Sequence, residues 1–267
     1  MSKIKFTKMV ASGNDFVVIE IPNPKSKIQN LSVLANRICD RKYGAGADGM
    51  LVLGKSKSAD IRMRIFNADG SEAEMCGNGA RCAALYASAR TPNLKIETMA
   101  GIVEARVKKD MVKIRLTDPH GLKLDFPINV GGRRLRVNFI NTGVPHTVIF
   151  VNGLEKIDVE GLGRQIRFHK QFSPKGTNVN FIEVADKNSI KIRTYERGVE
   201  GETLACGTGS TASALIFAIK AKALNSVNVQ TESQEVLKVY FNRNECKFRD
   251  VWLEGKARIV YTGVYNV

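Results

Sequence analysis

Residues 76–85 read CGNGARCAAL, and residues 206–215 read CGTGSTASAL. The two stretches agree at five of ten positions without a gap, and 130 residues separate their first cysteines. In each stretch a Cys-Gly-x-Gly motif opens a run of small residues with the pattern of a helix. One such motif is weak support for a site, because a tight turn before a helix uses the same residues. Two copies in the two halves of the chain indicate a duplicated unit.

The surroundings of the two motifs repeat as well. The strand-like segments IRMRIF (61–66) and IKIRTY (190–195) precede them, and an acidic loop lies between each segment and its cysteine. A weaker similarity relates GNDFVVI (13–19) to GVPHTVI (143–149). Short glycine-rich strings recur by chance, but the same order of loop, strand, acidic loop and motif in both halves favours a tandem duplication.

We therefore expect two pseudo-symmetric domains. The first would span residues 1–117 and be completed by the strand-like segment 258–267, and the second would span residues 118–257. The boundary is placed near TDPHG (117–121), where Asp-Pro and His-Gly interrupt a strand pattern. Most segments alternate with period two, and each half has one main helical pattern. This content predicts the α+β class rather than a doubly wound sheet.

Composition excludes several classes of protein. Hydrophobic residues make up 43% of the 267 residues, which is enough for packed cores. No apolar run is long enough to suggest a transmembrane helix, so we expect no membrane partner. The segment MSKIKFTKMV alternates apolar and basic residues like an opening strand rather than a signal peptide. The expected location is therefore the cytoplasm.

The charge and the cysteines point away from two further classes. The net charge is +15, but the densest basic cluster, Arg133, Arg134 and Arg136, has no interleaved aromatic residues. We expect a generally basic surface and no nucleic-acid partner. The five cysteines are odd in number and form no CxxC pair, so we expect neither a disulfide framework nor a metal site. Cys39, Cys82 and Cys246 lack the flanking motif and are interpreted as packing residues.

The two remaining cysteines, Cys76 and Cys206, have the context of reactive groups. The first N–H groups of a helix point outward at its positive end, where they bind carboxylates and lower the pKa of a cysteine. Inverting a carbon centre requires removal of a proton from one face and delivery of another to the opposite face. Two thiols, one ionised and one protonated, can do this and exchange roles with direction. We predict that the two cysteines act as such a pair.

Nearby carboxylates suggest a supporting role. Glu196 lies ten residues before Cys206, and Glu74 lies two before Cys76. A carboxylate can position a substrate or bias the protonation of a neighbouring group. For Glu74 we favour the simpler interpretation of a solvent-facing or helix-capping acid.

Polar side chains in glycine-bearing loops are candidate substrate ligands. The asparagines of this kind are Asn14, Asn67, Asn78 and Asn178. An amide can donate to a carboxylate and accept from an ammonium group, although a single asparagine more often serves a turn. Arg197 offers either a bidentate carboxylate clamp or a surface ion pair. His146 either assists Cys76 in proton transfer or is a core residue with its hydrogen bonds satisfied, and both interpretations stay open.

These motifs resemble the diaminopimelate epimerase family over nearly the whole chain. The matching segments are KMVASGNDFVVIE (8–20), RKYGAGADG (41–49), FNADGSEAEMCGNGARC (66–82), NTGVPH (141–146), GTNVNF (176–181) and YERGVEGETLACGTGSTA (195–212). The two cysteine motifs together are highly specific. The resemblance implies two similar domains, each a curved, mostly antiparallel sheet around a central helix, and a homodimeric assembly.

The resemblance also implies an activity. The chain would be an isomerase that converts LL-2,6-diaminopimelate, a small-molecule amino-acid substrate, to the meso form, in lysine and peptidoglycan-precursor synthesis, without pyridoxal phosphate or any other cofactor. Cys76 would be the proton donor and Cys206 the proton acceptor, and His146 and Glu196 would flank the thiols. The distal end of the substrate would be held by Asn14, Asn67, Asn178, Glu196 and Arg197. The carboxylate at the reacting carbon would be held by Gly77, Asn78, Gly207 and Thr208.

One residue departs from the family pattern, and the difference concerns the choice of substrate. Many members of this family carry asparagine in the GxPH loop, where this chain has Val144. The change removes one amide contact to the distal end of the substrate and leaves the proton-transfer pair unaffected. It leaves open an alternative, a racemase or epimerase of another amino acid, such as histidine, that uses the same cysteine pair.

Overall fold

The computed structural model describes residues 3–21, 30–89, 91–222 and 225–266. The chain divides into two compact units, Met1–Ile114 together with Gly255–Val267, and Arg115–Glu254. Each unit is described by itself below.

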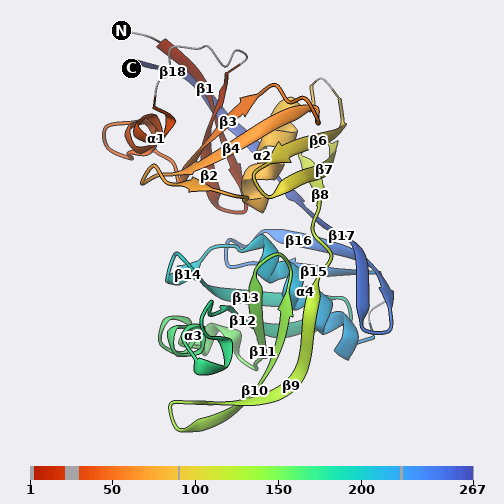
Figure 1. The fold of residues 1–267 in the computed structure, drawn as a ribbon. Coiled ribbons are helices and arrows are strands. Elements are labelled where there is room, and N and C mark those ends of the chain that lie inside the picture. The colour runs from red at the N-terminus through yellow and green to blue at the C-terminus, as the bar shows by residue number, and fades with distance from the viewer. Residues whose placement is uncertain (1–2, 22–29, 90, 223–224, 267) are drawn as a thin grey trace. The chain divides into compact units, whose positions relative to one another are not determined.

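The first unit is a mostly antiparallel sheet with two helices (Figure 1). Its strands lie in the order β18-β1-β2-β3-β4-β6-β7-β8, and the parallel pairs are β2–β3 and β4–β6. The short β5 pairs with β4. The bounds of the elements are β1 Lys3–Ala11, β2 Asn14–Glu20, α1 Leu31–Cys39, β3 Gly49–Gly54, β4 Ile61–Asn67, β5 Glu72–Ala73, α2 Gly77–Ala87, β6 Asn93–Thr98, β7 Gly101–Lys108, β8 Met111–Arg115 and β18 Arg258–Asn266.

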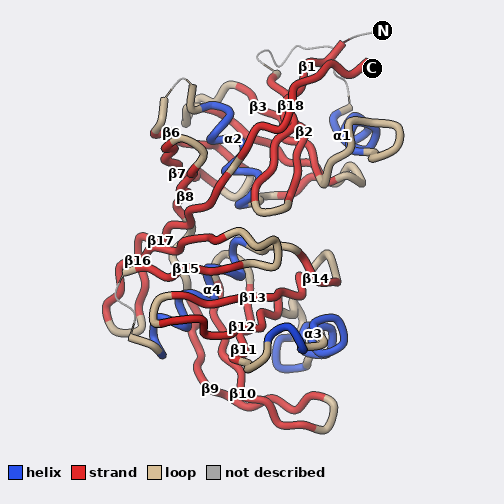
Figure 2. Tube along the Cα trace, turned by 180° about the vertical axis from the view of Figure 1, so that it is seen from behind, coloured by secondary structure: helices blue, strands red, loops and turns tan. Residues whose placement is uncertain are grey.

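The second unit repeats this arrangement (Figure 2). Its strands lie in the order β9-β10-β11-β12-β13-β15-β16-β17, and the parallel pairs are β11–β12 and β13–β15. The short β14 pairs with β13, as β5 does with β4. The bounds are β9 His120–Val130, β10 Arg133–Asn141, β11 Pro145–Phe150, η1 Leu154–Lys156, α3 Val159–Arg167, η2 Lys170–Phe172, β12 Asn178–Asp186, β13 Ser189–Glu196, β14 Gly201–Thr203, α4 Gly207–Lys220, β15 Ser226–Gln230, β16 Val236–Asn244 and β17 Lys247–Lys256.

Parallel and antiparallel pairs follow one another in the same sequence across both sheets. When the two sheets are aligned strand by strand, β18 of the first unit corresponds to β9 of the second. The last strand described, β18, therefore completes the first sheet. The predicted α+β class, with similar strand-rich halves and a main helix in each, is confirmed.

Each sheet has helices on both faces. In the first unit, Val17, Ile19 and Met50 pack against α1 in one apolar cluster. In the second unit, Val179 and Phe181 pack against α3 in the corresponding cluster. Fully burying an apolar side chain of this size stabilises the folded state by about 1.5–3 kcal/mol.

The central helices α2 and α4 lie on the opposite face and are almost wholly buried. Their sequences are rich in alanine and glycine, so the strands can approach the helix backbone closely. Burial of the whole helix fixes the position of its first turn, and that first turn is where each Cys-Gly-x-Gly motif lies.

Candidate active site

Cys76 is the N-cap residue of α2, with extended backbone angles (φ −140°, ψ 121°). Its Sγ accepts a hydrogen bond from the backbone N–H of Gly79 at 3.4 Å. The thiol also lies 3.9 Å from the Asn14 Oδ1, to which it can donate. The N–H group and the positive end of the helix favour the thiolate, whereas an amide oxygen favours the protonated thiol.

Cys206 occupies the equivalent position at the start of α4 (φ −117°, ψ 112°). Its Sγ accepts from the backbone N–H of Gly209 at 3.4 Å, and the Thr208 Oγ1 lies 3.5 Å away. A hydroxyl can donate to a thiolate, so Thr208 can stabilise the ionised form of Cys206.

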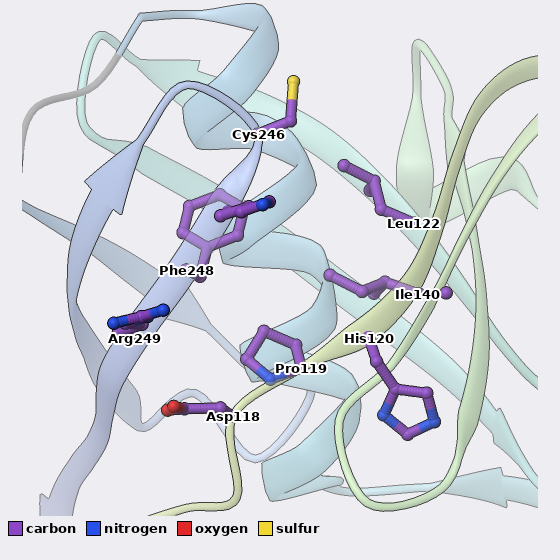
Figure 3. A pocket seen from close by; sticks show the side chains of 10 residues that line it. Asp118, Pro119, His120, Leu122, Ile140, Cys246, Phe248 and Arg249 are labelled. Atoms are coloured by element: carbon purple, nitrogen blue, oxygen red, sulfur yellow. The ribbon is translucent and has the colours of Figure 1, made fainter.

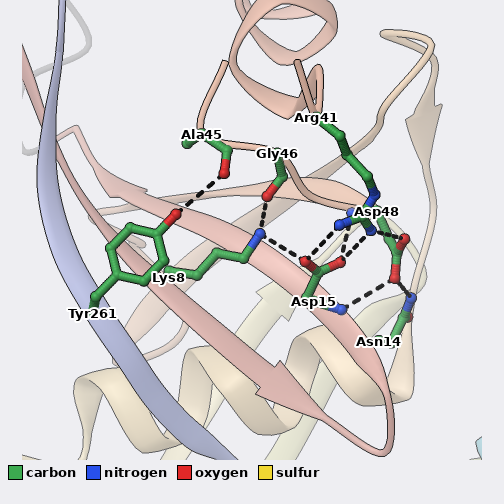
Figure 4. A network of polar contacts seen from close by, with 8 residues as sticks. All are labelled: Lys8, Asn14, Asp15, Arg41, Ala45, Gly46, Asp48 and Tyr261. Carbon is green, nitrogen blue, oxygen red and sulfur yellow. Dashed lines mark hydrogen bonds and ion pairs between the residues drawn. The ribbon is translucent and has the colours of Figure 1, made fainter. Parts of the chain in front are cut away.

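The orientation of Asn14 is set by a network of charged side chains (Figure 4). Its Nδ2 donates to Asp48 Oδ2 at 2.8 Å, which leaves Oδ1 toward Cys76. Arg41 bridges Asp15 and Asp48, with Nη2 2.9 Å from Asp15 Oδ1 and 2.7 Å from Asp48 Oδ1.

The buried Lys8 completes this network. Its Nζ lies 2.7 Å from Asp15 Oδ2 and also donates to the carbonyl of Gly46. Burial by itself raises the pKa of Asp15, but hydrogen bonds from Arg41 and Lys8 outweigh it and lower the pKa to about 2. The carboxylate therefore stays ionised and holds the start of β2 against the loop that carries Asp48.

Other predicted residues of the first unit differ in exposure. Asn67 is exposed, and its Nδ2 donates to Ser71 Oγ at 2.9 Å. Asn78 is buried, and its Oδ1 accepts from Arg81 at 2.8 Å. Gly77 is the half-buried first residue of α2. Glu74 is exposed, as the simpler interpretation of that residue expects.

In the second unit, Asn178 joins two loops. Its Nδ2 donates to the carbonyl of Pro145 at 3.0 Å, and its Oδ1 accepts from the backbone N–H of Arg197 at 2.8 Å. The Arg197 guanidinium donates to the carbonyl of Lys175 at 3.3 Å. Gly207 and Thr208 form the first turn of α4.

Glu196, at the end of β13, is a largely buried carboxyl group. Burial raises its pKa, and a hydrogen bond from Thr203 Oγ1 at 2.9 Å opposes this only in part. A carboxylate held in a poorly solvated position interacts strongly with any ammonium group brought beside it.

His146, on β11, is completely buried. Its Nδ1 lies 3.2 Å from the Asn180 Nδ2, while its Nε2 has no hydrogen-bond partner among the described residues. Burial, and secondarily the positive charge of Arg197, lower the pKa of His146 to about 3. The ring is therefore neutral at physiological pH, with one nitrogen satisfied and the other unsatisfied. The unsatisfied Nε2 differs from the interpretation of a core residue with all its hydrogen bonds satisfied, and the role of His146 beside Cys76 stays a prediction.

Sequence reasoning missed Asn180, Asp48 and Thr203, which contact the predicted residues directly. The signal for Asn180 was present, since it lies two positions after Asn178 and side chains two apart share a face of a strand. Asp48 and Thr203 had no such signal, because their partners are 34 and seven residues away along the chain.

A separate pocket of about 410 Å³ lies in the second unit (Figure 3). Residues from the start of β9 and from the β16–β17 hairpin line it, and none of the predicted site residues is among them. Within the described parts of the chain, no group of three or more His, Cys, Asp or Glu side chains is arranged to hold a metal ion. Nor does any helix in those parts have the length and apolarity needed to cross a membrane.

Comparison with known proteins places these features in context. The sequence profile of diaminopimelate epimerase matches residues 6–120 and 138–260. The chain is 42% identical to the diaminopimelate epimerase of Aquifex aeolicus, over 97% of each sequence. It is also 42% identical to the diaminopimelate epimerase of Methanocella arvoryzae, over 100% of this chain and 98% of that protein.

Among solved structures, the fold is similar to that of a Bacillus anthracis phenazine biosynthesis protein of the PhzF family. The TM-score is 0.77 with all of both chains covered, and at 19% identity this likeness shows the fold alone.

Proposed function

The chain belongs to the diaminopimelate epimerase family, and on that premise we propose that it inverts an α carbon of 2,6-diaminopimelate with Cys76 and Cys206 as its two proton-transfer groups. The family predicted from the sequence motifs is confirmed, and with it the isomerase class. The reaction is the conversion of the LL form to the meso form, which serves lysine biosynthesis.

One observation supports the assignment of the two cysteines above all others. Each is the N-cap residue of the buried central helix of its unit, and each Sγ accepts the N–H of the glycine three positions on. A helix N-terminus stabilises a thiolate and attracts a carboxylate at the same place. The reaction removes a proton from one face of the carbon and delivers a proton to the other face. Two structurally equivalent thiols suit these two steps.

In the forward direction we assign the base to Cys206 and the acid to Cys76. The Cys206 thiolate removes the α-proton, forming an S–H bond as the C–H bond breaks. The electron pair stays on the α carbon and its carboxylate until the Cys76 thiol delivers a proton to the opposite face. Donors beside Cys206 and the Asn14 acceptor beside Cys76 support this starting state. In the reverse direction the roles exchange.

The remaining residues hold the substrate. The first turns of α2 and α4 stabilise the charge that develops on the reacting carboxylate, through Gly77, Asn78, Gly207 and Thr208. The distal ammonium and carboxylate groups are bound by Asn14, Asn67, Asn178, Glu196 and Arg197. Of these, Glu196 supplies a buried negative charge and Arg197 a guanidinium group whose backbone is anchored by Asn178.

Val144 bears on a second candidate substrate. It lies half-buried beside Pro145, where an asparagine would offer an amide to the distal end of the substrate. A racemase for an amino acid without that end, such as histidine, would use the same thiols. Assay of a panel of amino acids for isomerisation separates the two candidates, and the proposal predicts that diaminopimelate is turned over fastest.

We propose a homodimer as the assembly and the cytoplasm as the location. Exposed apolar side chains on β18 support a dimer, among them Ile259, Val260 and Val264, each more than half exposed. A stripe of this kind on a strand favours an interface. A mechanism that needs two reduced thiols fits a reducing compartment. Light scattering of the purified protein gives the mass: a dimer is expected, and a monomer at micromolar concentration would contradict the assembly.

The activity is tested by incubating the purified protein with LL-diaminopimelate and separating the stereoisomers of the product. Cys76→Ala and Cys206→Ala are expected to abolish epimerisation in both directions. Cys82→Ala is the matched control, because this buried thiol lies in the same helix as Cys76 but away from its first turn. Substantial turnover in either of the first two variants would contradict the proposal, as would complete loss of turnover in a folded control.

A further inference from the structure

Asn180 lies at the centre of a buried hydrogen-bond arrangement in the second unit. Its Nδ2 donates to the backbone carbonyl of Thr147 at 3.1 Å and lies 3.2 Å from His146 Nδ1. Its Oδ1 accepts from Thr194 Oγ1 at 3.1 Å. The strand register explains why these groups meet, since Asn180 pairs with Thr194 across β12 and β13, and β11 runs parallel on the other side.

These contacts fix the orientation of the amide. A backbone carbonyl can only accept, so the atom that faces Thr147 must be the amide nitrogen. The second hydrogen of the same nitrogen then points to His146. Because an N–H group faces Nδ1, that ring nitrogen must carry a lone pair, and the proton of the neutral imidazole must be on Nε2.

The fixed tautomer leaves an unusual group in the interior. The Nε2–H of His146 is a buried donor with no acceptor among the described residues. An unsatisfied buried donor costs about 1–3 kcal/mol, so this donor gains free energy from any acceptor that comes within its reach. Burial and Arg197 hold the ring neutral, so it can donate this hydrogen bond without becoming a proton carrier.

The arrangement also touches the start of α4. A methyl group in place of the Gly209 hydrogen would overlap the amide oxygen of Asn180, so the amide packs directly against the turn whose N–H donates to Cys206 Sγ. Asn180 therefore contacts both His146 and the first turn of the helix that carries the proposed base.

We propose that Asn180 is a positioning residue that fixes His146 as a neutral Nε2–H donor. Its importance for turnover rests on the proposed function, whereas the position of the ring proton does not. Fixing the tautomer keeps the donor ready, so no proton has to be rearranged when negative charge develops.

The position of the proton can be measured directly by ¹⁵N NMR of the histidine rings. The chain has only three histidines, so protein labelled with [¹⁵N]histidine gives a simple spectrum of long-range H–N correlations. His146→Gln identifies the signals of the buried ring. We expect Nδ1 unprotonated and Nε2 protonated, unchanged between about pH 6 and pH 8.

Asn180→Asp is the informative variant. A carboxylate offers only acceptors, so it is expected to move the ring proton to Nδ1 or to convert the ring to imidazolium. Thr194→Val is the matched control, because it removes the donor to Oδ1 but leaves both contacts of Nδ2, and the tautomer is expected to stay the same. If Asn180→Asp does not fold, Asn180→Ser replaces it, with a mixture of tautomers expected.

Kinetics test the consequence for turnover. Asn180→Asp is expected to lower kcat about 100-fold or more with little change in KM, as loss of one preorganised donor does. A wild-type ring protonated on Nδ1, or an Asn180→Asp ring that keeps Nε2–H, would overturn the inference. So would unchanged kcat in a variant with an altered tautomer. If wild-type protein had the expected tautomer but no epimerase activity, the proposed function would fail and the assignment of the ring proton would stand.

Discussion

Single side chains differ between the two cysteine motifs even though the backbone is the same. Each thiol accepts a hydrogen bond from the backbone N–H of the residue three positions later in the chain. Asn14, however, offers an acceptor to Cys76, whereas Thr208 offers a hydroxyl group to Cys206. The sequence could predict the shared part, because Cys-Gly-x-Gly before a helix recurs. It could not predict the orientation of Asn14, because this depends on Asp48, which is distant along the chain.

Glu196 allows a test in which activity and stability change in opposite directions. Glu196→Gln removes the negative charge that we propose binds the substrate ammonium, so kcat/KM is expected to fall about 10-fold to 100-fold. Since burial raises the pKa of Glu196 above its usual 4.5, the folded state binds this proton more tightly than the unfolded state does. The stability this group contributes is present below pH 4.5 and is lost as pH rises through the folded pKa.

The Glu196→Gln variant has no buried carboxylate whose desolvation destabilises the folded state. Its free energy of unfolding, from urea denaturation, should therefore equal or exceed that of the wild type at pH 8, with a smaller difference at pH 4. A variant clearly less stable than wild type at pH 8 would show that the carboxylate is instead held by compensating contacts.

At the scale of elements, the central helices were predicted from the sequence, whereas the flanking helices α1 and α3 were not. Helix α3 contains Gly161 and Gly163, and two glycines in nine residues weaken the helix propensity that a sequence shows. A side chain at position 163 would collide with Tyr195, so close packing on the sheet requires that glycine. Tertiary packing therefore stabilises this helix despite its two glycines.

Two glycines in the first turns of the central helices, Gly77 of α2 and Gly209 of α4, tolerate side chains differently. A methyl group at Gly209 would overlap the Asn180 amide, whereas at Gly77 the nearest atom, Cδ1 of Ile114, would lie 3.6 Å away. Gly209→Ala is expected to lower the free energy of unfolding by about 1–3 kcal/mol. Gly77→Ala should change it by less than about 0.5 kcal/mol, whatever its effect on turnover. Equal losses in thermal denaturation of the two variants would show that Asn180 moves aside freely.

The Lys8–Asp15–Arg41 network should make the stability of the first unit depend on pH. The pKa of Asp15 is lowered to about 2, so its contribution is present above the ordinary value of 3.8 and is lost as pH falls toward 2. Asp15→Asn is expected to cost about 1–2 kcal/mol at pH 7, allowing for screening by solvent. The difference from wild type should shrink between pH 4 and pH 2. A difference that stays constant with pH in urea titrations would mean that packing, not charge, holds this loop.

At the scale of the whole molecule, the duplication was the strongest signal in the sequence. Ten aligned residues around each cysteine, and the period-two segments before them, predicted repeated strand-rich halves. The two sheets follow the same order of parallel and antiparallel neighbours, so the repeat extends well beyond the matching residues. The pKa shifts of His146 and Glu196 lay outside prediction, because they arise from burial that only the folded chain defines.

The most direct test of two-thiol chemistry follows hydrogen isotopes during a single conversion. LL-diaminopimelate is incubated with the protein in D₂O, and the α positions of substrate and product are examined by NMR and mass spectrometry at low conversion. The account predicts one solvent deuterium at the inverted centre of every meso product, because the second thiol exchanges with solvent before it donates, and no deuterium in the remaining substrate. Product that retains its original α-proton, or substrate that gains deuterium as fast as product forms, would point to one group acting on both faces and would contradict the account.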